Sequence, residues 1–102
     1  MLTRAEITAV IQELLAKYHA ESALLFGSYA RGEETPSSDV DLIVFGGSQF
    51  KKTHIFAFAE DLRYLTGKDA DVFEICELDQ GTSFYKAVMR DGIKITQSNH
   101  II

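Results

Sequence analysis

The sequence predicts an α/β fold of the α+β kind, in which a short mixed sheet of three or four strands carries helices on it. Apolar residues recur at helical spacing in several segments, apolar runs of strand length lie between these segments, and glycines or polar loops separate them. At 102 residues, we expect one domain over residues 1–102.

The first half of the chain is predicted to begin with an amphipathic helix over residues 4–18. Thr3 and Glu6 fit a capping box, which satisfies the free N–H groups at a helix start. Residues 22–26 (SALLF) read as a short buried strand, and the SYARG stretch after Gly27 has the length of one helical turn. The EETPSSD stretch that follows, with the only proline, is predicted to be a loop.

The second half is predicted to alternate strands and helices. Residues 39–46 (DVDLIVFG) form a strand whose continuous apolar half indicates that both faces are covered. Residues 52–66 form a helix that Gly67 ends, with an inward face of Ile55, Phe58, Ala59, Leu62 and Leu65. The remaining predicted elements are a strand over 69–75, a helix over 83–92 and a strand over 93–96.

Charge and composition limit the classes of function. The net charge of −5 argues against direct binding of nucleic acid or of an anionic membrane through a broad basic surface. The N-terminal residues contain no long uncharged apolar stretch, so we expect neither a signal peptide nor a membrane span. The single cysteine, Cys76, is expected to be a reduced, buried thiol, and the expected compartment is the cytoplasm.

Asp39 and Asp41 stand one residue apart at the start of the 39–46 strand. Residues two apart on a strand point to the same side, about 6.5 Å from each other. Two carboxylates this close repel each other unless a cation lies between them, and hard oxygen ligands suit Mg²⁺ or Mn²⁺. The alternative is that both side chains are merely solvated at the beginning of a strand.

Two further features add to this pair. Gly27 and Ser28 follow a buried strand, where a glycine lets the backbone approach a ligand and the N–H groups of the next turn can hold an anion; a plain strand-to-helix turn is the alternative. Asp71 lies at the start of the 69–75 strand, and it would complete a three-carboxylate metal site if that strand neighbours the 39–46 strand. Otherwise it is a solvated charge. A phosphate nest beside two metal ions is what nucleotidyl transfer requires.

The stretch GSYARGEETPSSDVDL resembles the G-S-x-A-R-G…S-D-x-D-L motif of the polymerase-β-like nucleotidyltransferase superfamily, and the whole chain is similar to its minimal nucleotidyltransferases. The resemblance implies that Gly27 and Ser28 hold the β- and γ-phosphates of ATP. It also implies that Asp39 and Asp41 bind two Mg²⁺ ions and that Asp71 binds the catalytic metal and helps to activate the attacking hydroxyl. Arg31 matches the motif and is expected either on the phosphate side or in a structural ion pair.

The resemblance also implies a partner. Minimal nucleotidyltransferases are commonly paired with HEPN-domain toxins, which are ribonucleases, and in some cases they act as antitoxins by transferring AMP from ATP to a toxin tyrosine. Phe56, which falls off the inward face of its helix, and the C-terminal NHII segment are candidate partner contacts, and homo- or hetero-oligomers are both compatible with the sequence. Tyr29 and Tyr64 are expected to be packing residues.

Two other functions remain open at this stage. One is nucleotidyl transfer to a small molecule or to RNA, although the acidic charge argues against RNA, and members that act on small molecules usually carry an extra helical domain. The other is a non-catalytic antitoxin that neutralises its partner by binding alone. The presence of all three aspartates argues against this last function.

Overall fold

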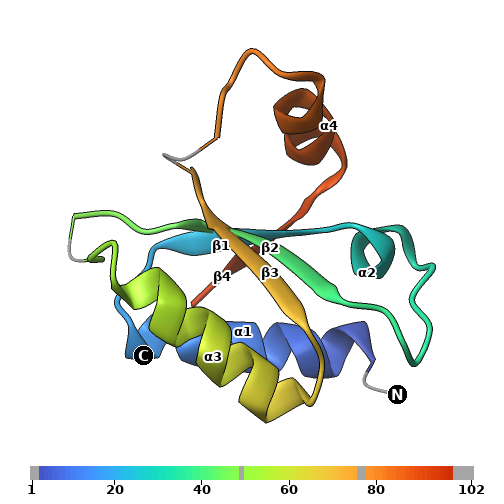
Figure 1. Ribbon diagram of the computed structural model, residues 1–102, viewed down its shortest axis with the longest axis horizontal. Coiled ribbons are helices and arrows are strands. Elements are labelled where there is room, and N and C mark those ends of the chain that lie inside the picture. Colours follow the sequence, from blue (N-terminus) through green and yellow to red (C-terminus); the bar gives the residue numbers. More distant parts are fainter. Residues whose placement is uncertain (1–2, 49, 76–77, 98–102) are drawn as a thin grey trace, which may run out of the picture.

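The computed structural model describes residues 3–48, 50–75 and 78–97. Its four strands form one mixed sheet in the order β3-β2-β1-β4, which confirms the predicted fold class. Figure 1 shows α1 and α3 on one face of this sheet and α4 on the other. The elements are α1 (Arg4–Lys17), β1 (Ser22–Phe26), α2 (Ser28–Arg31), β2 (Val40–Phe45), α3 (His54–Thr66), β3 (Ala70–Glu74), α4 (Ser83–Asp91) and β4 (Ile93–Thr96).

The capping box that starts α1 is present. The Glu6 amide donates to Thr3 Oγ1 at 3.1 Å, and the Thr3 amide donates to Glu6 Oε1 at 2.9 Å. Two backbone donors at the helix start are thereby satisfied.

Helix α3 ends at Gly67, which adopts a left-handed conformation (φ 67°), as predicted.

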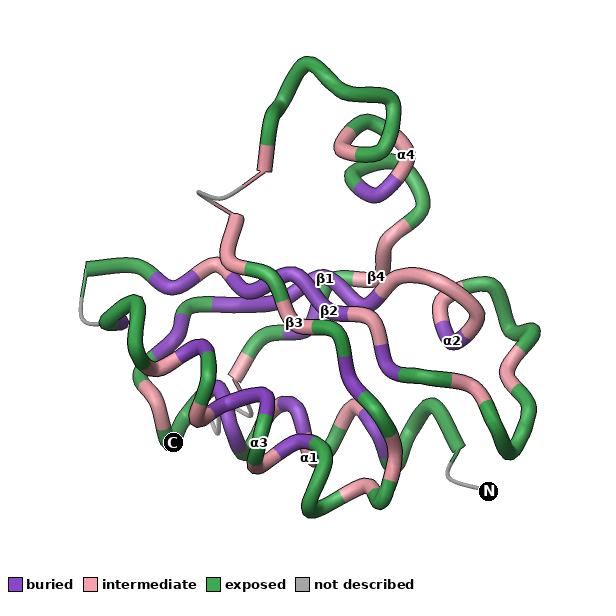
Figure 2. Tube along the Cα trace, in the orientation of Figure 1, coloured by how far each residue is buried: buried purple, intermediate pink, exposed green. Residues whose placement is uncertain are grey.

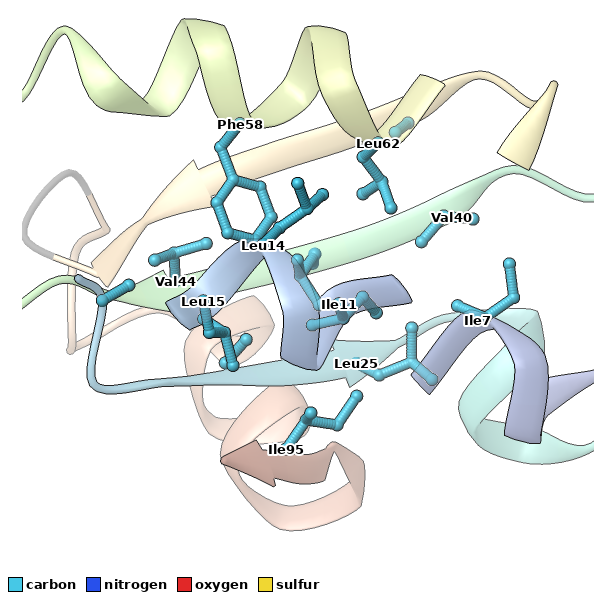
Figure 3. Close-up of a cluster of buried hydrophobic side chains, with 14 of the residues drawn as sticks. Ile7, Ile11, Leu14, Leu15, Leu25, Val40, Val44, Phe58, Leu62 and Ile95 are labelled. Atoms are coloured by element: carbon cyan, nitrogen blue, oxygen red, sulfur yellow. The ribbon is translucent and has the colours of Figure 1, made fainter. Parts of the chain in front are cut away.

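The main hydrophobic core lies between the sheet and the pair α1 and α3 (Figure 3). Figure 2 shows that the buried positions concentrate in the sheet and on the sheet-facing sides of these two helices. Tyr29, from the short helix α2, is fully buried in this core, which confirms its predicted packing role. The core therefore anchors the turn that follows β1.

A second, smaller cluster lies on the opposite face of the sheet. Val88 of α4 packs there against Leu24 of β1 and Ile43 of β2. Strand β2 is thus covered on both faces, as its continuous apolar run predicts.

The strand register decides which side chains meet. Strands β2 and β3 are parallel, with Asp41 opposite Asp71, and α3 provides the crossover that a parallel pair needs. Strands β1 and β2 are antiparallel, with Phe26 opposite Asp41. Side chains two residues apart share a face, so Asp41 lies on the same face as Ile43, the face that carries α4.

Two side-chain predictions for α3 are wrong. Leu65 is 47% exposed and Tyr64 is 87% exposed, although both were expected to pack inward. The buried stripe of α3 ends at Leu62, because the last turn lies beside the outer surface of α1, where Lys17 forms an ion pair with Asp61 at 2.7 Å. The other inward residues, Ile55, Phe58, Ala59 and Leu62, are buried as predicted.

Some predictions fall on residues that the structure does not describe. Cys76 and the NHII segment at 99–102 lie outside the described residues. Within the described residues, no helix combines the length and the apolar character that crossing a membrane requires.

Candidate active site

Asp41 and Asp71 form the centre of the candidate site. The two residues are register partners on neighbouring strands, which meets the condition under which Asp71 was predicted to join the acidic pair. The pKa of the Asp41 carboxyl is raised, first by its burial, then by the negative charges of Asp71 and Asp39 and by a hydrogen bond with Asp71. The protein therefore holds a partly buried carboxylate against another acid, an arrangement that a bound cation would stabilise.

Gly27 lies directly against this acidic pair. Its φ of 75° and ψ of −152° fall in a region that is nearly restricted to glycine, and a Cβ at this position would collide with Asp41 Oδ2. Ser28, the next residue, begins α2, and the amides of Ala30 and Arg31 donate back to the Gly27 carbonyl at 3.1 and 3.2 Å. The close approach of the Gly27 backbone to Asp41 places the Gly-Ser turn and the carboxylates in one site.

Asp39 lies in the loop that precedes β2, and its charge contributes to the raised pKa of Asp41. The described residues contain no set of three His, Cys, Asp or Glu side chains that is already arranged to hold a metal ion. The structure thus brings Asp41 and Asp71 together, whereas a three-carboxylate metal site that includes Asp39 stays a prediction. The donors that are present, carboxylate oxygens with an uncompensated charge, fit Mg²⁺ or Mn²⁺.

Comparison with known proteins assigns this site to a family. The family model described as "Polymerase beta, Nucleotidyltransferase" matches residues 9–101. The chain belongs to this nucleotidyltransferase family. The match includes the Gly-Ser turn and all three aspartates, so the resemblance noted in the sequence is confirmed.

A curated relative of the nucleotidyltransferase comes from Methanocaldococcus jannaschii. It is named "Putative protein adenylyltransferase MJ1379" and is 38% identical over 69 residues, which cover 64% of this chain and 65% of the relative. The chain therefore matches slightly less than two thirds of the length of that protein.

Two solved structures share the fold. A crystal structure of a toxin-antitoxin with AMP-PNP superposes with a TM-score of 0.74 at 20% identity, covering 90% of this chain and 74% of that one. A tri-AMPylated HEPN toxin of Shewanella oneidensis in complex with an MNT antitoxin superposes with a TM-score of 0.70 at 17% identity, covering 94% of this chain and 74% of that one. Both likenesses confirm the nucleotidyltransferase fold.

Lys68 supports the loop beside the site, a role that the sequence patterns missed. Its ammonium group donates to the Ser38 carbonyl at 2.8 Å and to the Pro36 carbonyl at 3.0 Å, and it lies 5.6 Å from the centre of the Tyr29 ring. These bonds hold the loop immediately before Asp39 against the start of β3. No motif marks this lysine, because its partners are backbone carbonyls 30 and 32 residues away in the chain.

We expect Lys68→Met to weaken Mg²⁺-ATP binding several-fold while leaving the protein folded. The substitution keeps most of the side-chain length but removes the two hydrogen bonds that hold the Asp39 loop, each worth about 1 kcal/mol. Calorimetry should show the weaker binding, and circular dichroism should show an unchanged fold. Unchanged affinity would mean that the loop position does not contribute to the site.

Arg31 takes part in an ion pair and also lies near the carboxylates. Its Nε contacts Glu33 Oε1 at 2.7 Å, and both side chains are exposed. Its positive charge lowers the pKa of Asp41 and of Asp91, against the larger effects that raise the Asp41 value. Because exposed ion pairs are weak, the contact with Glu33 does not prevent the guanidinium from turning to a phosphate. Both roles predicted for Arg31 therefore remain compatible with its position.

Proposed function

We propose that the protein is a metal-dependent nucleotidyltransferase that transfers AMP from ATP to a tyrosine hydroxyl of a partner protein. The observation that carries this proposal is the meeting of Asp41 and Asp71 on adjacent strands directly beside the Gly27-Ser28 turn. Membership of the polymerase-beta nucleotidyltransferase family and similarity to proteins named as adenylyltransferases support it.

The three aspartates are the proposed ligands of two Mg²⁺ ions, with Mn²⁺ as a possible replacement. Bound there, the ions would lower the pKa of the attacking hydroxyl and offset the charge that develops on the transferred phosphoryl group. Asp41, with its raised pKa, is the residue whose charge most needs such a counterion. The proposal requires the three carboxylates to come closer together when metal binds, because among the described residues they do not form a ready-made cluster.

Other groups of the site bind the substrate, and Asp71 has a second proposed role in taking up the proton. The backbone of Gly27 and the hydroxyl of Ser28 are the proposed partners of the β- and γ-phosphates, with Arg31 beside them. The acceptor oxygen bonds to the α-phosphorus, and the bond from that phosphorus to the bridging oxygen breaks, which releases pyrophosphate. Asp71 is the proposed residue that helps to activate the hydroxyl by accepting its proton.

The proposed partner is a HEPN-domain toxin, and the proposed role is that of its antitoxin in the cytoplasm. Two of the solved structures that share this fold are described as toxin-antitoxin assemblies, and one of these contains an AMPylated HEPN toxin with an MNT antitoxin.

The test uses α-labelled ATP, Mg²⁺ and the purified protein mixed with lysate of its own host. A labelled protein band that the Asp39→Asn/Asp41→Asn double variant fails to produce would establish transfer to a protein, and excision of the band would identify the acceptor. Label in RNA or in a small molecule would replace the protein acceptor with one of these. If no label appears with any nucleoside triphosphate, the proposal of catalysis is wrong.

Ser28→Ala is expected to weaken Mg²⁺-ATP binding by about 1 kcal/mol or more, because it removes one hydrogen-bond donor to the phosphates. Ser48→Ala, in the loop after β2, is the matched control and should bind ATP like the wild type. Titration calorimetry of both variants measures the effect. Equal affinities would assign Ser28 a structural role only.

A further inference from the structure

A groove of about 300 Å³ runs between α3 and β3, and Asp71 forms part of its wall. Its other walls include Phe56, Glu60 and Arg63 of α3 and Phe73 of β3. Phe56 is 73% exposed and Phe73 is 37% exposed, so the groove is flanked by two aromatic side chains that the core does not use. Asp71 is the register partner of Asp41, so its side chain lies on the α4 face of the sheet, and the groove adjoins the strand edge that carries this carboxylate.

The order of the strands indicates what this groove is for. Gly27 follows β1, Asp41 lies on the adjacent β2, and Asp71 lies on β3 at the edge of the sheet. In an in-line displacement, the attacking oxygen and the leaving oxygen lie on opposite sides of the phosphorus. If the leaving phosphates are held at Gly27, the acceptor approaches from the side of Asp71, which is the edge of the sheet along which the groove runs.

The edge of β3 offers backbone groups to an incoming chain. In the described sheet, β3 pairs with β2 alone, and the Val40 amide donates to the Asp69 carbonyl at 3.0 Å. Because alternate residues of a parallel strand face its neighbour, Ala70, Val72 and Glu74 direct their N–H and C=O groups away from β2. Arg63 donates to the Ala70 carbonyl at 2.9 Å, so Val72 and Glu74 remain as the positions that an added strand can pair with.

The charges around the groove are predominantly negative. Asp71 and Glu60 line it, and Asp69 and Glu74 flank the strand. Arg63 is engaged by Glu60 at 3.3 Å and by the Ala70 carbonyl. A segment with a lysine or arginine near its hydroxyl residue therefore complements this edge.

We propose that the groove binds the acceptor as an extended, basic polypeptide segment that runs along β3, places its hydroxyl residue at Asp71 and packs an apolar side chain on Phe56. This proposal rests on the proposed nucleotidyl transfer, and it adds the surface that selects the acceptor. Phe56 is a specificity-determining residue in this arrangement, because it contacts the segment away from the reacting atoms.

The test uses a pool of synthetic peptides with a central tyrosine and two randomised residues on each side, together with Mg²⁺ and α-labelled ATP. Labelled peptides should be enriched in apolar and basic residues beside the tyrosine. For the best peptide, Phe56→Ala should raise KM about tenfold with little change in kcat, which is typical of the loss of an aromatic anchor. Tyr64→Ala removes an exposed aromatic side chain from the same helix outside the groove, and it should leave KM unchanged.

Calorimetry of Mg²⁺-ATP binding separates failure of the groove from failure of the proposed function. Wild type, Phe56→Ala and Tyr64→Ala should bind ATP equally. If the wild type labels a protein of the lysate but no peptide, if the labelled peptides show no flanking preference, or if Phe56→Ala and Tyr64→Ala have equal KM values, the groove assignment is wrong. If ATP binds but neither lysate nor peptides are labelled, the proposed transfer itself is wrong. If the wild type binds no Mg²⁺-ATP, the proposed function itself is wrong.

Discussion

Asp41→Asn is expected to abolish Mg²⁺-ATP binding and AMP transfer while the protein stays folded. Asparagine has nearly the same shape as aspartate but lacks the charge that a hard divalent cation requires. Asp41 is the central carboxylate of the site, because it lies opposite Asp71 and its pKa also responds to the charge of Asp39. We therefore expect a larger functional effect from this substitution than from those at Ser28 or Lys68.

The same substitution should stabilise the metal-free protein at neutral pH. Burial, the charges of Asp71 and Asp39 and a hydrogen bond with Asp71 raise the pKa of Asp41 in the folded state. Because its pKa is raised, Asp41 holds its proton more tightly in the folded protein than in the unfolded chain, and this difference adds to the free energy of unfolding. The contribution is fully present below the pKa of Asp41 in the unfolded chain and is lost as the pH rises through its pKa in the folded protein. Wild type should therefore gain stability relative to Asp41→Asn as the pH falls toward 4, the region of the ordinary aspartate pKa.

Thermal unfolding in EDTA and in Mg²⁺, over a range of pH, measures both effects. Mg²⁺ with ATP should raise the Tm of the wild type but not that of Asp41→Asn. Asp79→Asn is the matched control, because its side-chain oxygen accepts from the Gly81 amide at 2.9 Å, a bond that asparagine can keep. A Tm increase with Mg²⁺-ATP in Asp41→Asn equal to that of the wild type would show that the carboxylate does not hold the metal.

The sequence predicts which residues form this site better than it predicts that these residues come together. Alternation along a strand places Asp39 and Asp41 on one side, and the Gly-Ser turn after a buried strand is visible in the local pattern. No local sequence pattern predicts that the strand carrying Asp71 pairs with β2. The strand order depends on the crossover through α3 and on the packing of α1 and α3 against one face of the sheet. The sequence therefore predicts Asp71 as a site residue only on the condition that its strand pairs with β2, and the register of β2 with β3 meets that condition.

The errors have related causes. Helical periodicity assigns Leu65 to the same face as Leu62, but it does not predict how far α1 extends along α3. In the structure, α1 leaves the last turn of α3 half exposed. Lys68 donates to backbone carbonyls, and every residue has such a carbonyl, so no residue type in the sequence marks the partners of this lysine. Contacts of this kind are determined by tertiary structure, and the sequence reveals them only once the fold is known.

Gly27→Ala is expected to destabilise the fold and to abolish nucleotide binding. The conformation at Gly27 is one that residues with a Cβ rarely adopt, at a cost of about 1–3 kcal/mol, and the added methyl group would also collide with Asp41 Oδ2. Overpacking of this kind costs about 1–3 kcal/mol more. Displacement of the Asp41 carboxylate would further disturb its position beside Asp71.

Gly67→Ala is the matched control for this prediction. Gly67 also has a positive φ, but its left-handed conformation is accessible to other residues, and a Cβ there meets nothing within 4 Å. We expect Gly67→Ala to cost about 1–2 kcal/mol of stability and to leave Mg²⁺-ATP binding unchanged. Denaturant unfolding and calorimetry of both variants make the comparison.

A double-mutant cycle with Asp41→Ala separates the two contributions at Gly27. In that background the collision is absent, so Gly27→Ala should cost less than in the wild type. The remaining cost should still exceed that of Gly67→Ala, because the backbone conformation at Gly27 is the more restricted. If Gly27→Ala costs the same with and without the Asp41 carboxylate, the close approach of the Gly-Ser turn to the acidic pair is not what requires a glycine here. The proposed sharing of one substrate by the turn and the carboxylates would then lose its main geometric support.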